Sequence, residues 1–383
     1  MSLKQEMGIS VLDAALDRVR SLYDMGRRPV VSFSGGKDST ACLELTLMVA
    51  KERDKLPVDV VMRDEEIMFP GTYEYCERVR ERKNEFAFHW LVAGQPVVNA
   101  FDRANPYWWV FDPLVPPQRW VRLPPDYAER MPQLDILSMT TLERFPPEER
   151  GIPVTIMGLR AEESWRRMVT IHMSRGHMTL HPNAKGIYHS RPIYDWKDSD
   201  VWLFVKKFNL DYCTAYDTML KLGVPRKRLR IAPPTLVGKA LDDLKMASQA
   251  WPAWWERVCD RLPGMRTAAM FGKRAVTPQR RLGETWEECF KRTCLGDDTP
   301  EWIRERAFKV SDQILRMHGR HSTTPLPQVQ HCRMCKDSMG SWRKLALTMY
   351  MGDPIMTSQK LVPAMEPEFF RPGAGKWLGP ASF

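Results

Sequence analysis

The sequence predicts an α/β protein with a doubly wound parallel sheet of the Rossmann-like kind, followed by a mainly helical C-terminal domain. Helical patterns over residues 38–53 and 72–84 separate short apolar runs that are typical of strands. Alternating strands and helices favour a parallel sheet with helices on both faces. The strand pattern stops near residue 232, and helical periodicity follows. The predicted strands are 29–34, 58–66, 86–93 and 154–160.

We therefore expect two domains, an α/β domain at 1–232 and a mainly helical domain at 233–383. The first carries a long insertion at about 96–150 between its third and fourth strands. This insertion is rich in proline, tryptophan and tyrosine, as in "NPYWWVFDPLVPPQRW". Connections of that length in α/β domains are usually functional or form a lid.

Composition and charge narrow the class of protein. The 383 residues carry a net charge of +10, and no window approaches the eighteen uninterrupted apolar residues that suggest a membrane span. The N-terminus alternates charged and apolar residues, which is not typical of a signal peptide. We therefore expect a cytoplasmic protein, in which the eight cysteines are thiols or metal ligands and not disulfides.

The stretch "VVSFSGGKDSTACLEL" (30–45) has the chemistry of a phosphate-binding loop. Gly35 and Gly36 allow backbone amides to approach an anion, and the helix that follows presents unpaired amides. A Walker loop is excluded, because Lys37 is followed by Asp38 and the residue five before Gly36 is Val31. Lys37 adds a point charge, and further hydroxyl donors are Ser34, Ser39 and Thr40.

"SFSGGKDST" resembles the pyrophosphate loop (PP-loop) of the ATP pyrophosphatase, or adenine nucleotide alpha hydrolase-like, superfamily. "MGLRAEESWRR" (157–167) and "RPIYDWKDSDVW" (191–202) resemble elements of phosphoadenosine phosphosulfate reductase-like proteins. "MRDEEIMFPGTYEY" (62–75) departs a little from their Asp-Thr-Gly segment. The resemblance covers about residues 25–215. In "RPIYDWKDSDVW", Asp198 is expected to cap a helix.

The resemblance implies binding of ATP or a related adenine nucleotide, with cleavage at the α-phosphate and release of pyrophosphate. It implies Mg²⁺ on the phosphates, with Asp38 or Glu66 as carboxylate contacts. The implied catalytic residues are Lys37, Asp38 and Arg160. The implied nucleotide-binding residues are Ser32, Ser34, Gly35, Gly36, Lys37, Asp38, Ser39, Thr40, Met62, Glu66, Gly158 and Arg160. A second substrate would contact Glu163, Ser164, Arg166 and Arg167.

Two cysteine pairs near the C-terminus form a second candidate site. "CFKRTC" places Cys289 and Cys294, and "HCRMC" places Cys332 and Cys335. Such pairs fit a four-thiolate site for zinc or a [4Fe–4S] cluster, and unligated thiols are the alternative. The Glu-Cys-Gly-x-His segment of assimilatory sulfonucleotide reductases is missing from the sequence.

The excess of positive charge favours a polyanionic partner such as nucleic acid. It is concentrated in "GVPRKRLR" (223–230) and "GKRAVTPQRRLG" (272–283), although an anionic nucleotide pocket would also use such residues. Three functions remain open. The first is a PP-loop enzyme that activates an acceptor for modification of nucleic acid, including sulfur-related modification as in the DNA phosphorothioation proteins that the chain resembles. The others are a sulfonucleotide reductase and a non-enzymatic nucleotide-binding transcriptional regulator. A protein partner is a further expectation for the chain.

Overall fold

A computed structural model describes residues 8–131, 139–173, 176–233, 244–332, 340–355 and 361–370. The chain divides into two compact units. The first unit combines Met1–Gln95 with Arg122–Pro233, and the second combines Pro96–Val121 with Pro234–Phe383. The expected insertion at about 96–150 is thus divided after Val121, with its first part in the second unit and its remainder in the first. The predicted domain boundary at 232 and the bounds of the insertion stay predictions. Among the described helices, none is long and apolar enough to cross a membrane.

The first unit is built on a six-stranded sheet with the order β6-β3-β2-β1-β7-β8. Every pair of neighbouring strands in it runs parallel, which confirms the predicted doubly wound sheet. From β1 the chain moves outward to β2 and β3, and later it returns to the other side of β1 to form β7 and β8. The strands are β1 (Arg27–Ser32), β2 (Val58–Arg63), β3 (Phe86–Ala93), β6 (Glu129–Met131), β7 (Ile152–Ile156) and β8 (Tyr188–Ser190).

The order of strands reverses between β1 and β7, and this reversal determines where a ligand can bind. In open α/β sheets the crevice beyond the carboxyl ends of the strands at such a point is the usual ligand site. The loops that follow β1 and β7 therefore meet at the place where the sequence predicts nucleotide contacts.

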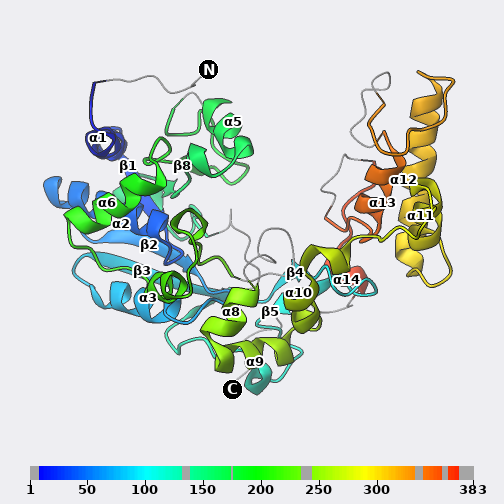
Figure 1. Ribbon diagram of the computed structural model, residues 1–383. Helices are drawn as coiled ribbons and strands as arrows, with labels where there is room; N and C mark the ends of the chain where they lie inside the picture. Colours follow the sequence, from blue (N-terminus) through cyan, green and yellow to red (C-terminus); the bar gives the residue numbers. More distant parts are fainter. Residues whose placement is uncertain are drawn as a thin grey trace. The chain divides into compact units, whose positions relative to one another are not determined.

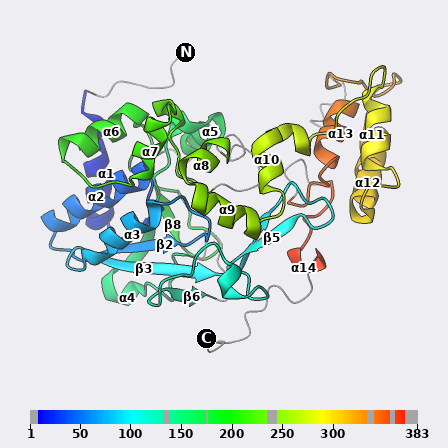
Figure 2. The same cartoon turned by 60° about the horizontal axis from the view of Figure 1, so that its bottom comes forward.

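Helices cover the sheet (Figures 1 and 2). α2 packs against β1 and β2, α1 and α6 pack against α2, and α3 packs against β3. α1 starts after Ser10, whose hydroxyl oxygen accepts the Asp13 N–H at 3.0 Å and so satisfies an amide of the first turn. The helices of this unit are α1 (Val11–Asp24), α2 (Lys37–Glu52), α3 (Thr72–Glu81), α4 (Pro147–Arg150), α5 (Trp165–Met173), α6 (Asp198–Lys207) and α7 (Ala215–Lys221), with 3₁₀ turns at Ala161–Glu163 and Arg226–Arg228.

Phe145 fills a cluster of buried side chains on the three central strands. The cluster includes Val30 of β1, Val61 of β2 and Leu91 of β3, all fully buried, and Phe145 itself has no exposed surface. The Arg28 guanidinium lies 4.9 Å from the centre of the Phe145 ring. The segment before α4 thus covers this part of the sheet with an apolar side chain. Parallel sheets are usually covered on both faces.

In the second unit most aromatic residues of the insertion are core residues. Trp108, Trp109 and Trp120 are at most 5% exposed, and Phe111 is fully buried. The Arg261 guanidinium donates to the Trp109 carbonyl at 2.5 Å, so the insertion packs on the helical part of the same unit. These rings are therefore not available to stack on bases.

The rest of the second unit is mainly helical, which confirms that prediction. Phe290, Ile314 and Leu345 come from three helices, α11, α12 and α13, and share one buried cluster. The elements of this unit are β4 (Gln95–Val98), β5 (Tyr107–Val110), α8 (Leu244–Ala250), α9 (Pro252–Arg261), α10 (Met265–Phe271), α11 (Trp286–Cys294), α12 (Glu301–Gly319), α13 (Trp342–Met349) and α14 (Pro367–Phe370), with 3₁₀ turns at Pro117–Arg119 and Gly272–Val276.

We predict that Phe145→Ala lowers the free energy of unfolding of the first unit by about 3–5 kcal/mol, because it removes a buried ring and leaves a cavity over the central strands. Urea denaturation followed by circular dichroism measures this. Leu203→Ala is the control, since Leu203 on α6 is 63% exposed, and it should change the free energy by less than about 0.5 kcal/mol. Equal effects of the two substitutions would contradict the prediction.

Candidate functional site

The loop between β1 and α2 requires glycine at its first turn. Gly35 has φ +71°, a left-handed conformation that residues with a side chain rarely adopt. A side-chain carbon at this position would also lie 2.9 Å from Thr72 Cγ2 and 3.2 Å from Cys76 Sγ on α3. Gly36 follows as the N-cap of α2. The loop therefore packs closely against α3. Its amides lie at the start of α2, a helix of sixteen residues.

Two of the predicted hydroxyl donors are used inside the loop itself. Ser39 Oγ accepts the Ser34 N–H at 3.2 Å and donates to the Gly36 carbonyl at 2.9 Å. Thr40 Oγ1 also donates to the Gly36 carbonyl, at 3.0 Å, and lies 2.9 Å from the Tyr75 hydroxyl. Ser34 is exposed and lies 3.2 Å from Ser39 Oγ. Ser34 is therefore better placed to meet a ligand than Ser39 or Thr40, which are buried and shape the loop.

Gly158 brings the loop after β7 into contact with the start of α2. A side-chain carbon at Gly158 would lie 2.7 Å from the Asp38 carbonyl carbon, 2.8 Å from its oxygen and 2.9 Å from the Ser39 nitrogen. Backbone atoms cannot move aside as a flexible side chain can, so only glycine fits here. This contact joins the two loops of the switch point.

Lys37 is buried among polar groups from three parts of the chain. Its Nζ lies 3.2 Å from Asp38 Oδ2, 3.3 Å from Asp198 Oδ1 and 3.5 Å from the Leu229 carbonyl oxygen, and its side chain is 5% exposed. A buried ammonium requires such partners. Lys37 is thus fixed beside the loop before any ligand is present.

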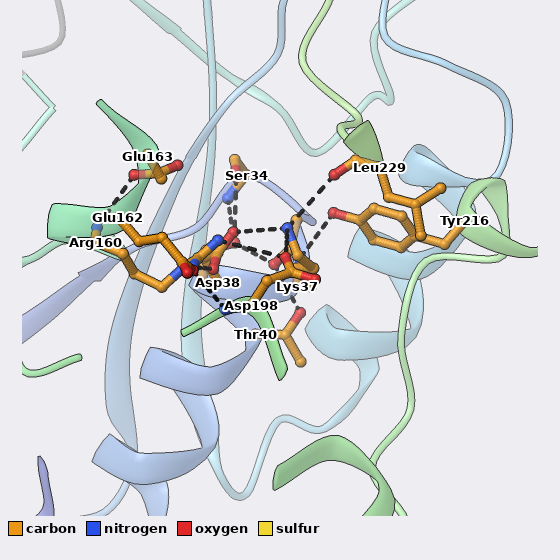
Figure 3. Close-up of polar contacts among 12 residues, drawn as sticks. Ser34, Lys37, Asp38, Thr40, Arg160, Glu162, Glu163, Asp198, Tyr216 and Leu229 are labelled. Carbon is orange, nitrogen blue, oxygen red and sulfur yellow. Dashed lines mark hydrogen bonds and ion pairs between the residues drawn. The ribbon is translucent and has the colours of Figure 1, made fainter. Parts of the chain in front are cut away.

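Arg160 completes the charged cluster from the other side (Figure 3). Its Nε donates to Asp38 Oδ1 at 2.5 Å, and its terminal nitrogens lie 3.0 Å from Glu162 and 3.5 Å from Asp198. Figure 3 shows the Asp38 carboxylate between Arg160 and Lys37. The structure thus brings together the three residues predicted to be catalytic, Lys37, Asp38 and Arg160.

Asp198 lies in this charged cluster, although the sequence predicts only the role of a helix cap for it. The N-cap of α6 is Lys197, and the carboxylate that bonds its N–H is that of Asp200, at 2.7 Å. The cap assignment is therefore wrong, because Asp198 is the first residue of the helix. Its carboxylate instead contacts both Lys37 and Arg160, and its own N–H donates to Glu162 Oε2 at 2.8 Å.

The residues predicted for a second substrate lie next to this cluster. Glu163 Oε2 accepts the Arg160 N–H at 3.1 Å and pairs with the Arg167 guanidinium. Ser164 Oγ accepts the Arg167 N–H at 3.2 Å. Burial, and then the positive charge of Arg230, lower the pKa of Arg167. The side chain of Arg166, in α5, lies outside the described part of the structure.

Three other predicted nucleotide contacts lie near the same edge of the sheet. Ser32 is the last residue of β1 and is half-buried, while Met62 is fully buried in β2. Glu66 is also fully buried, has φ +59°, and donates its N–H to Asp64 Oδ1 at 3.1 Å. The nucleotide-binding roles of these residues stay predictions.

Tyr216 and the segment around Leu229 are neighbours of the loop that no motif identified. The Lys37 N–H donates to the Tyr216 hydroxyl oxygen at 3.0 Å, and Leu229 offers its carbonyl to Lys37 Nζ. Leu229 and Ile231 are buried, whereas Arg228 and Arg230 are exposed. The alternation in "RLRI" was a signal for an extended segment with one apolar face, and it connects the basic segment 223–230 with the phosphate loop.

The predicted thiolate site is only partly within the described structure. Cys289 and Cys294 are buried on α11, and burial raises the pKa of Cys294 to about 12. Cys332 is also buried, and Cys335 lies outside the described residues. Within the described ranges, no group of three or more histidine, cysteine or acidic side chains is arranged to hold a metal ion. The four-thiolate site stays a prediction.

In comparison with known proteins, residues 28–106 match the family model of the phosphoadenosine phosphosulfate reductase domain. YbdN of Escherichia coli, described as an uncharacterized protein, is 26% identical over 376 residues, covering 91% of this chain and 90% of YbdN. A phosphoadenosine 5'-phosphosulfate reductase of Aliivibrio fischeri is 23% identical over 199 residues, covering 52% of this chain and 67% of the reductase. The FMN adenylyltransferase of Candida glabrata, solved with FMN and an ATP analog, gives a TM-score of 0.33 at 13% identity, covering 56% of this chain and 63% of that one.

We predict that Gly158→Ala lowers the free energy of unfolding by about 1–3 kcal/mol, because the new methyl group meets backbone atoms of α2. Gly176→Ala is the matched control, since a side-chain carbon at Gly176 has no atom within 4 Å. Thermal and urea denaturation of both variants measure the difference. A Gly158→Ala protein as stable as Gly176→Ala would mean that the two loops are not in contact.

Proposed function

Because residues 28–106 match the phosphoadenosine phosphosulfate reductase domain, we propose that this chain is a PP-loop enzyme that acts on ATP or a related adenine nucleotide. The nucleotide binds at the carboxyl ends of β1 and β7, and the α-phosphate is attacked with release of pyrophosphate. One observation carries the proposal: Lys37, Asp38 and Arg160 converge beside the glycine-rich loop at the switch point of the sheet.

The cations are suited to the charge that develops in this reaction. Departing pyrophosphate gains negative charge, which the amides at the start of α2 and the Lys37 ammonium stabilise. The Arg160 guanidinium presents several N–H donors in one plane and can bond two phosphate oxygens at once. Asp38 pairs with both cations and orients them in the absence of ligand. Asp38 is thus a positioning group for the two cations.

Mg²⁺ fits this site only as a partner of the nucleotide. It usually binds through one or two carboxylates together with substrate phosphates. Asp38 lies at the loop and is 19% exposed, so it can serve as one such carboxylate, whereas Glu66 is fully buried. Mg²⁺ bound there would neutralise phosphate oxygens.

A sulfonucleotide reductase is the second candidate, and the similarity to a named reductase over 199 residues favours it. The sequence has no Glu-Cys-Gly-x-His segment, so this reaction would need a cysteine elsewhere, such as Cys332 or Cys335. Sulfite release from phosphoadenosine phosphosulfate measures this activity directly. Its absence in the intact protein would exclude the reductase.

We propose nucleic acid as the acceptor that is activated. The basic segment 223–230 supports this proposal, because Arg226 and Arg230 are exposed and Leu229 of the same segment contacts Lys37. Exposed arginines at such a position can neutralise backbone phosphates and hold a strand next to the nucleotide. In the second unit Lys273, Arg280 and Arg281 are exposed and supply a further basic surface.

We predict that Lys37→Ala lowers pyrophosphate release by at least about 100-fold, because it removes a positive charge from the place where negative charge develops. Incubation with α-labelled ATP and candidate nucleic acids, with detection of pyrophosphate and of a labelled adduct, measures this. Lys55→Ala is the control, since Lys55 is exposed beyond the end of α2, and it should keep full activity. If the Lys37→Ala protein kept full biological activity in cells, the enzyme proposal would fail and a regulatory role would replace it.

We predict that Arg226→Ala and Arg230→Ala each weaken nucleic-acid binding, because each substitution removes one cation that pairs with a phosphate. The slope of log affinity against log salt concentration should become shallower by about 1 for each arginine that is replaced. Fluorescence anisotropy with single- and double-stranded oligonucleotides at several salt concentrations measures both effects. Arg320→Ala, an exposed arginine after α12, is the control. Unchanged affinity and slope in both test variants would exclude the segment as a nucleic-acid contact.

A further inference from the structure

The phosphate loop is bordered by a tyrosine that lies far from it in the sequence. A side-chain carbon at Gly36 would lie 3.3 Å from Ser34 Oγ, 3.6 Å from the Tyr216 hydroxyl oxygen and 3.8 Å from Ile231 Cγ1. The hydroxyls of Ser34 and Tyr216 therefore both lie beside Gly36, a residue of the loop whose amides are expected to approach an anion. Figure 3 shows Tyr216 next to Lys37, on the side away from Arg160.

The Tyr216 hydroxyl has a donor hydrogen for which the described residues supply no acceptor. Its oxygen accepts the Lys37 N–H at 3.0 Å. A phenol can also donate a hydrogen, and among the described residues no oxygen or nitrogen is placed to accept it. The side chain is 2% exposed, and burial raises the pKa of Tyr216 far above its usual value, so the hydroxyl keeps its hydrogen at neutral pH. A buried donor without an acceptor is costly, which favours an acceptor supplied by a ligand.

Packing fixes the position of this hydroxyl. The Tyr216 ring meets the edge of Trp202 of α6 with ring centres 5.2 Å apart, and Lys37 Nζ lies 5.9 Å from the Tyr216 ring centre. A buried ring in such contacts cannot rotate its hydroxyl away from the loop. The donor is therefore held in place before a ligand arrives, so binding costs little side-chain entropy.

We propose that Tyr216 is a nucleotide-binding residue whose hydroxyl donates a hydrogen bond to a phosphate oxygen at the loop. The hydroxyl then accepts from the first amide of α2 and donates to the ligand. It links the helix to the phosphate that the helix binds. This inference rests on the proposed function, because it requires an adenine nucleotide at the loop.

Tyr216→Phe in the full-length protein tests the proposal, with calorimetric titration of ATP and of adenosine. We expect ATP binding to weaken about tenfold, because the substitution removes a hydrogen bond to a charged group, while adenosine binding stays unchanged. Tyr212→Phe is the matched control. Tyr212 also meets Trp202, with ring centres 5.6 Å apart, but its hydroxyl bonds Asp217 at 3.0 Å and not the loop. This variant should bind ATP as the unaltered protein does.

Thermal unfolding with and without ATP provides a second measurement. The Tyr216→Phe protein should unfold near the temperature of the unaltered protein when ATP is absent and should gain less stability when ATP is added. Unchanged or tighter ATP binding by Tyr216→Phe would overturn the proposal, and so would an equal weakening of ATP and adenosine binding. If the unaltered protein bound no ATP, the proposed function would fail and this inference with it.

Discussion

The contact between Gly158 and the first turn of α2 is the constraint on which the arrangement of the candidate site depends. In a doubly wound sheet the loops after β1 and β7 leave on opposite sides of the switch point, so they need a close backbone contact to act together. With no side chain at position 158, the peptide between Asp38 and Ser39 lies against this loop. Two residues later, Arg160 is then close enough to bond Asp38, and Asp38 in turn bonds Lys37. One backbone contact thereby places three charged side chains.

The positive and negative charges of these side chains also compensate one another. Lys37 and Arg160 each have side chains only 5% exposed, and an unpaired cation at such depth would be strongly unfavourable. Asp38, Asp198 and Glu162 supply the compensating charge. Since Asp38 and Asp198 are 19% and 25% exposed, they border the open side of the cluster. Under the proposed function, phosphate oxygens arriving at the loop exchange with these carboxylates, and the cations need not move far.

The parts of the fold that local sequence determines were predictable, and the parts set by distant contacts were not. Alternating apolar runs indicated the strands, and the glycines with Lys37 and Asp38 indicated the loop. Asp198, Tyr216 and Leu229 reach Lys37 from 161, 179 and 192 positions away in the chain, so no local pattern connects them with it. Ser39 has the same hydroxyl whether it binds phosphate or its own loop, and only the geometry of Gly36 distinguishes the two.

The segment around Leu229 connects the phosphate loop with the arginines proposed to contact the acceptor. Leu229 and Ile231 are buried and their neighbours Arg228 and Arg230 are exposed, so one extended strip of chain contacts the loop with one face and presents cations on the other. The carbonyl that bonds Lys37 belongs to the peptide between Leu229 and Arg230. A polyanion that binds the Arg230 side chain therefore acts within one residue of the Lys37 contact. Under the proposed function, a shift of this peptide would change the balance of partners around Lys37, so that acceptor binding and phosphate binding would be parts of one electrostatic system.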